Sequence, residues 1–249
     1  MAKTTGLGNR FYYQGVDVSG DVCAIKALAS PMAPIEKTGI NQSAYQRVGG
    51  LRDGNMEFKS HFNAVAAGSF QTIKTLPTTD VVLTWALSAT AGDPCASMVA
   101  KLVTTDYERD DEGDFTYEVQ AQANGYGLDW GTQMTAGLRT ESAATNGAAV
   151  DFGTGSTAFG LQAFVHVTAL SSGTPTIKLQ ESSDDDGDPD TWADVTGGTF
   201  GVVTAPSAAR IETSRTQTVE RYLRVVTTGT FSGLSFWVGV NRNGESTVF

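Results

Sequence analysis

The sequence predicts a mainly β protein that carries one short helix. Three observations support this fold class. Apolar and polar residues alternate with a period of two in several segments, glycine is plentiful at 28 residues, and charged residues make up only 18% of the chain. Alternation places one face of a strand against a core and leaves the other in water. Glycine supplies the tight turns that join such strands.

The first part of the chain predicts short strands around a long arm. The pattern of 11–21 predicts a strand, a turn and a second short strand. Residues 27–50 contain Pro31, Pro34 and three glycines, which indicates a long loop or an extended arm. The dipeptide Asp-Gly at 53–54 is a turn signal, and the alternation after it predicts a strand over 56–62.

The best helix candidate follows this strand and spans 64–76, where four apolar residues recur at helical spacing. Pro77 ends the helix because proline has no N–H to continue the hydrogen-bond ladder. Two apolar runs, 80–87 and 98–103, then predict buried strands.

The most informative stretch is 106–131, which combines an acidic turn at 106–114, an alternating strand at 115–123 and a closing motif of glycine and aromatic residues. One face of the predicted strand is apolar. The other face carries Thr116, Glu118, Gln120 and Gln122 and no positive charge. The first face therefore belongs to a core and the second to solvent.

The second half of the chain predicts a β-sandwich without helix. Residues 138–149 are small and polar without periodicity, which predicts a linker. Beyond it, 161–169, 176–180 and 234–240 alternate, and glycine, serine and threonine turns separate them. The predicted domains are therefore 1–137 and 150–249, joined by that linker.

Composition limits the classes of function. A net charge of −10 argues against proteins that grip phosphate backbones, because such binding depends on Lys and Arg. No segment has the eighteen or so apolar residues of a membrane helix, and the N-terminus shows no apolar signal region, so we expect folding in the cytoplasm without membrane contact. Cys23 and Cys95 are too few for a disulfide framework and are expected to be free, partly buried thiols.

Few residues suggest chemistry. The acidic run 182–192 fits a calcium loop poorly and an Asp-box-like hairpin better, and a solvated hairpin tip is the simplest interpretation. His61 and His166 are each expected on the polar face of a strand, away from any catalytic partner. The segment 221–226 could be a basic–aromatic patch, but we expect its arginines to pair with acids. We therefore expect no enzyme activity, cofactor or metal.

Several motifs resemble the major tail proteins, or tail-tube proteins, of long-tailed (siphovirus-type) bacteriophages, in particular those of actinobacteria. In the N-terminal half the resemblance lies in Phe11–Val22, Gly50–Phe58, Thr75–Thr78 and Gln122–Gly131. In the C-terminal half, which is similar to the β-rich extension of such proteins, it lies in Lys178–Ser183, Trp192–Val195 and Arg221–Val225.

The resemblance implies a virion protein with an N-terminal tail-tube fold, a β-sandwich or barrel with one short helix, followed by a C-terminal β-sandwich. It implies hexameric rings that stack into a tube for DNA ejection, with tail terminator, tape measure and baseplate proteins as partners. DNA would pass through without sequence-specific binding. Glu118, Gln120 and Gln122 would face the channel. The residues expected to contact the next ring are Pro31, Pro34, Ile35, Ile40 and Tyr45.

Three alternatives stay open at this point. The C-terminal half could bind host carbohydrate through exposed aromatic residues such as Phe164 or Trp237. Both halves could build the tube, so that a trimer imitates a hexamer. The Asp-box-like hairpin could belong to a glycosidase, although no pair of carboxylates can be assigned to that chemistry.

Overall fold

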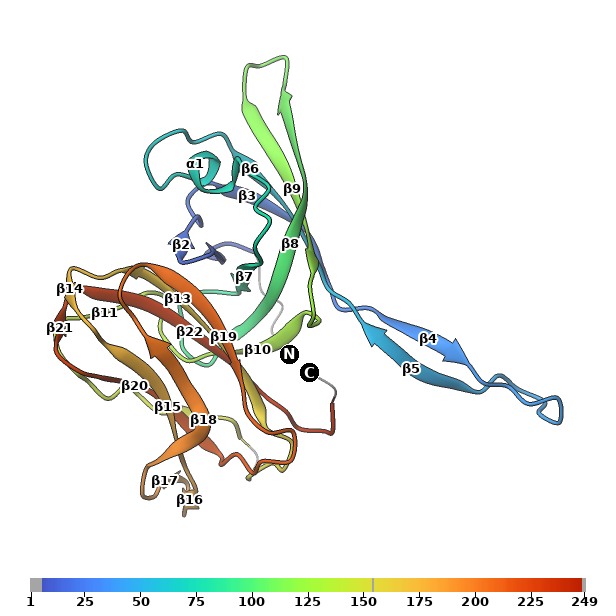
Figure 1. The fold of residues 1–249 in the computed structure, drawn as a ribbon, viewed down its shortest axis with the longest axis vertical. Coiled ribbons are helices and arrows are strands. Elements are labelled where there is room, and N and C mark those ends of the chain that lie inside the picture. Colours follow the sequence, from blue (N-terminus) through green and yellow to red (C-terminus); the bar gives the residue numbers. More distant parts are fainter. Residues whose placement is uncertain (1–5, 154, 248–249) are drawn as a thin grey trace.

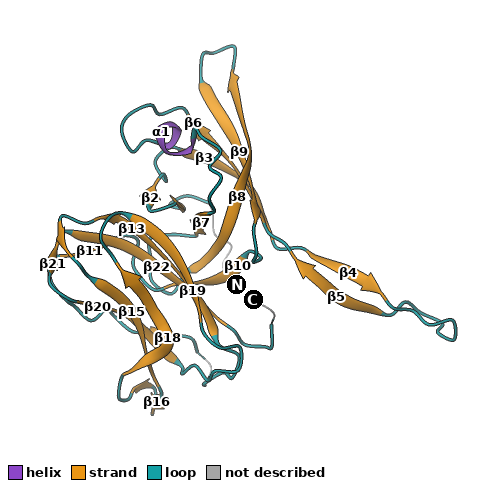
Figure 2. Ribbon diagram, in the orientation of Figure 1, coloured by secondary structure: helices purple, strands orange, loops and turns teal. Residues whose placement is uncertain are grey.

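The computed structural model describes residues 6–153 and 155–247, and the fold is mainly β, as the sequence predicts (Figures 1 and 2). In chain order the elements are β1 (Arg10–Tyr13), β2 (Val16–Asp17), β3 (Val22–Ala29), β4 (Met32–Glu36), β5 (Arg47–Arg52), β6 (Asn55–His61), α1 (Ser69–Ile73), β7 (Val81–Ala86), β8 (Pro94–Arg109), β9 (Phe115–Ala123), β10 (Asp129–Gln133), β11 (Arg139–Glu141), β12 (Val150–Asp151), β13 (Leu161–Ala169), β14 (Ser172–Gly173), β15 (Thr176–Ser182), β16 (Asp184–Asp185), β17 (Asp188–Pro189), β18 (Ala193–Val202), β19 (Ser207–Glu212), β20 (Tyr222–Thr228), β21 (Phe231–Ser232) and β22 (Leu234–Arg242).

One antiparallel sheet of twelve strands passes through both halves of the chain. Its main path is β19-β13-β22-β10-β8-β7-β1-β2, and β11 pairs with β22. A branch leaves at β8 and continues through β9, β6 and β3. The branch exists because β8, at 16 residues, is longer than its neighbour β7. Ala100 pairs with Val81 of β7 on one side and with Ala123 of β9 on the other. Among the described residues, the rest of β8, from Lys101 to Arg109, pairs with β9 alone.

Three clusters of buried side chains hold the sheet against its neighbours. One lies under β6, β8 and β9 in the N-terminal half and includes Met56, Phe58 and Val119. A second fills the space between β13, β22 and the four-stranded sheet β12-β20-β15-β18, which forms the predicted C-terminal sandwich. The third joins the two halves through Tyr12, Cys95, Phe164 and Trp237. Each wholly buried side chain of this size contributes about 1.5–3 kcal/mol.

Strand β13 is buried on both faces, which corrects the prediction for His166. Alternate residues from Leu161 to Val167 pack in the sandwich core, while Phe164 and His166 face the N-terminal half. The His166 ring lies 5.6 Å from the Tyr12 ring and is fully buried. The second face of β13 was expected in water, because a period of two cannot show that another domain covers the polar-looking side.

The predicted helix over 64–76 is reduced to the five residues of α1. The loop before it is pinned, because Asn63 Nδ2 donates to Asp21 Oδ1 at 2.9 Å and the Ser69 backbone N–H donates to Asp21 Oδ2 at 2.9 Å. Ala67 has a φ of 61°, which interrupts any helix that begins before it. The side chain of Ile73 is buried as the helical spacing predicted.

The segment 138–149 contains β11, although it was predicted to be a linker without strands. Arg139 pairs with Phe236 in the sheet, and its Nη1 donates to the Val225 carbonyl of β20 at 3.0 Å. Glu141 is buried and accepts a hydrogen bond from Thr227 Oγ1. The segment is thereby fastened to both sheets of the sandwich, and the domain division at this point stays a prediction.

Candidate assembly surfaces

The branch β3-β6-β9-β8 has one apolar and one polar face. On β9, Tyr117, Val119 and Ala121 are buried, and Gln120 and Gln122 are exposed on the opposite face. The predicted residues Glu118, Gln120 and Gln122 thus share the wet face of this sheet. The predicted alternation is confirmed from Tyr117 to Gln122, whereas at the start of the strand Phe115 is exposed and Thr116 is buried.

Lysines from the neighbouring strands also lie on this polar face, which the pattern of β9 alone could not show. Lys26 of β3 forms an ion pair with Glu118. Lys59 of β6 lies opposite Glu118 in the register and reaches Glu108, with 3.6 Å between Nζ and Oε2. Lys101 of β8, opposite Gln122, pairs with Asp80 at 2.8 Å. Each of these three lysines is therefore held by a carboxylate.

Both outer strands of the branch have an open edge. Among the described residues, β3 pairs only with β6. The part of β8 beyond Ala100 pairs only with β9. A hollow of about 550 Å³ lies beside the start of β3, lined in part by Leu7, Cys23 and Trp85. Unpaired N–H and C=O groups along such an edge are a template for a strand from another chain.

The predicted arm is a β-hairpin that projects from the body (Figure 1). It is made of β4 and β5, and the Asp53 backbone N–H donates to the Pro31 carbonyl at its base. Both strands are almost wholly exposed. The five predicted contact residues all lie in it and are all exposed: Pro31, Pro34, Ile35, Ile40 and Tyr45. An isolated two-stranded hairpin is marginally stable in water, and this one buries little surface of its own.

The two histidines have different surroundings, one at the surface and one in the interior. His61 is a surface residue, as predicted, with Nδ1 at 3.5 Å from Asp114 Oδ1. His166 Nδ1 accepts a hydrogen bond from the Gly15 backbone N–H at 3.2 Å, and its Nε2 lies 2.9 Å from Thr84 Oγ1. Burial lowers the pKa of His166 to about 3. The imidazole is therefore neutral and structural.

The two cysteines lie in different surroundings. Cys23 is an exposed free thiol, and Cys95 is free and buried between the two halves. Burial raises the pKa of the Cys95 thiol far above its ordinary value. A thiol must ionise to act as a nucleophile, so Cys95 is inert. The expectation of two free thiols is confirmed, although Cys23 is more exposed than expected.

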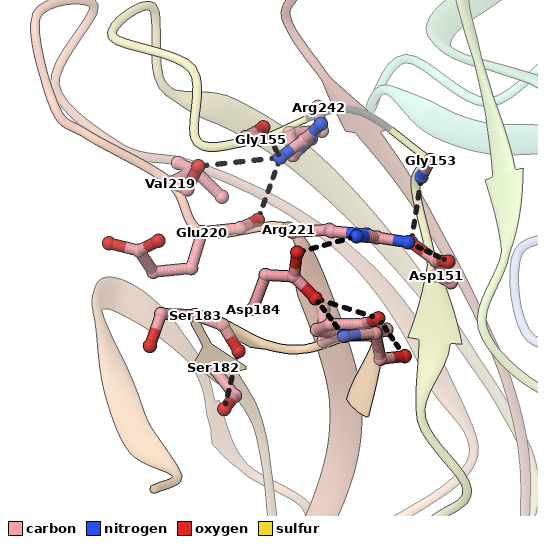
Figure 3. Close-up of polar contacts among 12 residues, drawn as sticks. Asp151, Gly153, Gly155, Ser182, Ser183, Asp184, Val219, Glu220, Arg221 and Arg242 are labelled. Carbon is pink, nitrogen blue, oxygen red and sulfur yellow. Dashed lines mark hydrogen bonds and ion pairs between the residues drawn. The ribbon is translucent and has the colours of Figure 1, made fainter. Parts of the chain in front are cut away.

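The acidic run forms a small hairpin of β16 and β17 that an arginine fastens to the sandwich (Figure 3). Arg221 donates from Nε and Nη2 to the two oxygens of Asp151, each at 2.8 Å, and its Nη1 lies 2.8 Å from Asp184. These contacts lower the pKa of Asp151 to about 2. The Tyr222 hydroxyl donates to the Gly187 carbonyl at 2.6 Å. The predicted hairpin is confirmed, and Arg221 pairs with acids as expected. Arg224 differs, because its Nε and Nη2 donate to Gln180 Oε1.

Within 6–153 and 155–247, no three His, Cys, Asp or Glu side chains are grouped so that they could hold a metal ion. In the same residues, no helix has the length and apolar character needed to cross a bilayer.

The two aromatic platforms expected for carbohydrate are in the interior, which corrects that prediction. Phe164 is 2% exposed and Trp237 is wholly buried. Trp237 Nε1 donates to Gln133 Oε1 at 3.1 Å, across the junction of the halves. Both side chains join the C-terminal half to the N-terminal half instead of facing a ligand.

Comparisons with known proteins give likenesses of low similarity. No protein-family model matches the sequence, and no curated protein matches it. A chain of the virion of a native gene transfer agent particle matches with 10% identity and a TM-score of 0.38, over 51% of this chain and 98% of that chain. The Dit protein of phage SPP1, described as a hub adsorption apparatus of phages that infect Gram-positive bacteria, matches with 10% identity and a TM-score of 0.35, over 94% and 99%.

A third solved structure, the baseplate of phage P2 in its activated conformation with Ca, matches with 9% identity and a TM-score of 0.37, over 96% of this chain and 99% of that chain. At TM-scores below 0.5 these likenesses assign no function to the chain.

Proposed function

We propose that the chain is a structural protein of a phage tail that closes into rings through the branch β3-β6-β9-β8. The observation that carries this proposal is the pair of open edges. The branch has four antiparallel strands, with β3 at one edge and β8 at the other, so β3 and β8 run in opposite directions. The β8 edge of one copy can therefore pair antiparallel with β3 of the next copy. Repetition around an axis removes every open edge of the branch.

Strand geometry favours six copies in a ring. A barrel with strands about 4.8 Å apart and tilted by about 40° is about 24 Å wide between backbones for twelve strands, and about 48 Å for twenty-four. The two grooves of duplex DNA are about 8.5 and 7.5 Å deep, so the duplex is wider than the sum of these depths. Side chains on the inner wall narrow the channel further. Only the wider barrel then leaves room for the duplex. Six copies of a four-stranded branch supply twenty-four strands.

The trimeric alternative requires the C-terminal half to supply an equivalent sheet. Its four-stranded sheet ends at β12, which has two residues, and its other outer strand β18 contacts β19. That sheet therefore lacks two long open edges at which strands of neighbouring copies could pair. The hexamer is therefore the ring that the branch supports best.

The polar face of the branch would line the channel. Glu118, Gln120 and Gln122 would point to the axis, and the lysines beside them are already paired with carboxylates. A face without free cations, on a chain of net charge −10, would give phosphates no partner. DNA would then slide without being held. The protein would act as a conduit in the virion and would catalyse no reaction.

The arm would stack one ring on the next. Its exposed apolar residues, such as Ile35, Ile40 and Tyr45, need a partner surface. A hairpin that leaves the body at its side can reach a copy in the adjacent ring (Figure 1). The ends of a stack would meet tail terminator, tape measure and baseplate proteins, after assembly in the host cytoplasm.

Sedimentation and negative-stain microscopy of the purified chain test this function. Rings with a central hole, or tubes built of them, are the expected result. A chain that stays monomeric at a concentration of about 1 mM, well above typical interface dissociation constants, contradicts it.

A further inference from the structure

A buried carboxylate connects the arm to both halves of the molecule. Asp129 lies on β10, and its side chain is 1% exposed. Arg52, at the end of β5, donates from Nη2 to Asp129 Oδ1 at 3.0 Å. Arg210 of β19 approaches the other oxygen, with 3.8 Å between Nε and Oδ2. The Asp129 carboxylate thus contacts one arginine from the base of the arm and one from the C-terminal half.

The residues before Asp129 hold the base of the arm on both sides. The Leu128 carbonyl accepts hydrogen bonds from Ser30 Oγ at 3.0 Å and from Arg52 Nη2 at 3.3 Å. A Cβ at Gly127 would lie 3.2 Å from the Arg52 guanidinium, so a larger residue there would push the guanidinium away by a few tenths of an ångström. The base of the hairpin is therefore fixed where the chain enters it and where it leaves.

Arg210 carries a buried charge that lies between two carboxylates. Its side chain is 5% exposed, and its Cζ lies 3.8 Å from the centre of the Tyr126 ring. Nη1 donates to Glu212 at 2.7 Å. Nε and Nη2 are buried without a hydrogen-bond partner among the described residues, and so is Asp129 Oδ2. A buried charge is costly unless it is paired. Arg210 Nε and Asp129 Oδ2 face each other at 3.8 Å, and each side chain has one further ionic partner, Glu212 for Arg210 and Arg52 for Asp129.

We propose that Asp129 positions the arm by tying its base, through Arg210, to the C-terminal half. The hairpin has no core of its own, so contacts at its base determine its direction. If Arg52 and Leu128 alone held the arm, its direction would depend only on the N-terminal half. With Arg210 on the second oxygen, a shift of the C-terminal half moves the carboxylate and the arm with it. This inference goes beyond ring formation and does not depend on it.

Distances between spin labels in the full chain test the proposal. Cys23 is exposed, Cys95 is buried, and Ser43 lies exposed in the tip of the arm, so labels on Cys23 and on Ser43→Cys report the direction of the arm. We expect one narrow distance distribution in the parent protein. Asp129→Ala and Arg210→Met should each broaden it at least twofold. Thermal unfolding of each variant is measured in parallel.

The control is Asp151→Ala, which removes a carboxylate from the Arg221 pair in the C-terminal half and should keep the narrow distribution. A purely structural role of Arg210 would lower the unfolding temperature without changing the distances. The proposal is overturned if Arg210→Met keeps the parent distribution, even where Asp129→Ala broadens it, because the C-terminal half then has no part in holding the arm. If Asp129→Ala does not fold, Arg210→Met decides.

Discussion

Lys26 on β3 forms an ion pair with Glu118 on β9, across the intervening strand β6. In the same row, Lys59 lies opposite Glu118 on one side and Asp106 lies opposite it on the other. Like charges directly opposite each other are destabilising. The two lysines offset the repulsion between Asp106 and Glu118, and the carboxylates in turn leave no lysine available to phosphate.

A first prediction concerns the charge of this face. Glu118→Lys releases Lys26 and adds a cation, so assembled protein should retain a fluorescent DNA duplex at 50 mM salt and release it at 200 mM. Unmodified assemblies should retain none. The control is Glu112→Lys, which makes the same change of charge in the exposed turn between β8 and β9. Equal retention by both variants would remove the argument that this face lines the channel.

A second prediction concerns the open edge of β8. The Asp110 N–H donates to the Asp114 carbonyl, and hydrogen-bonded pairs alternate along antiparallel strands, so the Thr105 N–H points away from β9. Thr105→Pro removes a donor from the open edge without breaking the β8–β9 ladder. We expect a folded monomer by sedimentation. Thr105→Val, which keeps the N–H, should still form rings; ring formation by Thr105→Pro would count against pairing at this edge.

A third prediction concerns the arm. Ile40 is fully exposed and Tyr45 is 68% exposed in the tip. The double variant Ile40→Ser and Tyr45→Ser should form single rings but few stacks in negative-stain micrographs. Val202→Ser, an exposed apolar residue of the C-terminal half, serves as the control and should stack normally. Tubes of normal length from the double variant would exclude the arm tip from stacking.

A fourth prediction follows from the pKa of His166. Burial lowers its folded-state pKa from the ordinary value of 6.5 to about 3. Between these values the unfolded chain binds a proton that the native protein does not, so the stability that depends on neutral His166 is complete above pH 6.5 and is lost as pH falls toward 3. His166→Gln should weaken this fall in denaturant titrations at pH 7, 5.5 and 4. If the free energy of unfolding of His166→Gln falls with pH as steeply as that of the parent protein, the lowered pKa of His166 is contradicted.

A fifth prediction tests the continuity of the sheet across the halves. A Cβ at Gly131 would lie 2.6 Å from the Val240 carbonyl oxygen, where β10 pairs with β22. Gly131→Ala should lower the free energy of unfolding by about 1–3 kcal/mol because the strands must separate. Gly244→Ala, where a Cβ would meet nothing within 4 Å, should change it little. Denaturant titration of both variants provides the comparison.

The sequence predicted the elements that depend on local pattern. The strand at 115–123 has the predicted bounds because apolar and polar residues alternate there and only one face is covered. The arm at 27–50 was anticipated from its prolines and glycines, although its two strands were not. Segments with a clear period of two and turn residues at their ends can therefore be located without a structure.

The contacts between distant segments could not be predicted. His166 looked exposed because its strand alternates, but the N-terminal half covers that face with Tyr12. Asp129 looked like part of a turn motif, and its two arginine partners are 77 and 81 residues away in the sequence. The prediction of a helix over 64–76 was wrong in its first part, because Asp21 holds Asn63 in a loop. Each error concerns a partner that local periodicity does not contain.

A cryo-electron microscopy map of assembled protein, resolved well enough to trace strands, tests the central claim most directly. The account predicts six copies in a ring, with β3 of each copy paired antiparallel to the 101–109 part of β8 in its neighbour, and with Glu118 facing the channel. A ring in which these two edges stay unpaired, or in which Glu118 faces the outside, would contradict it.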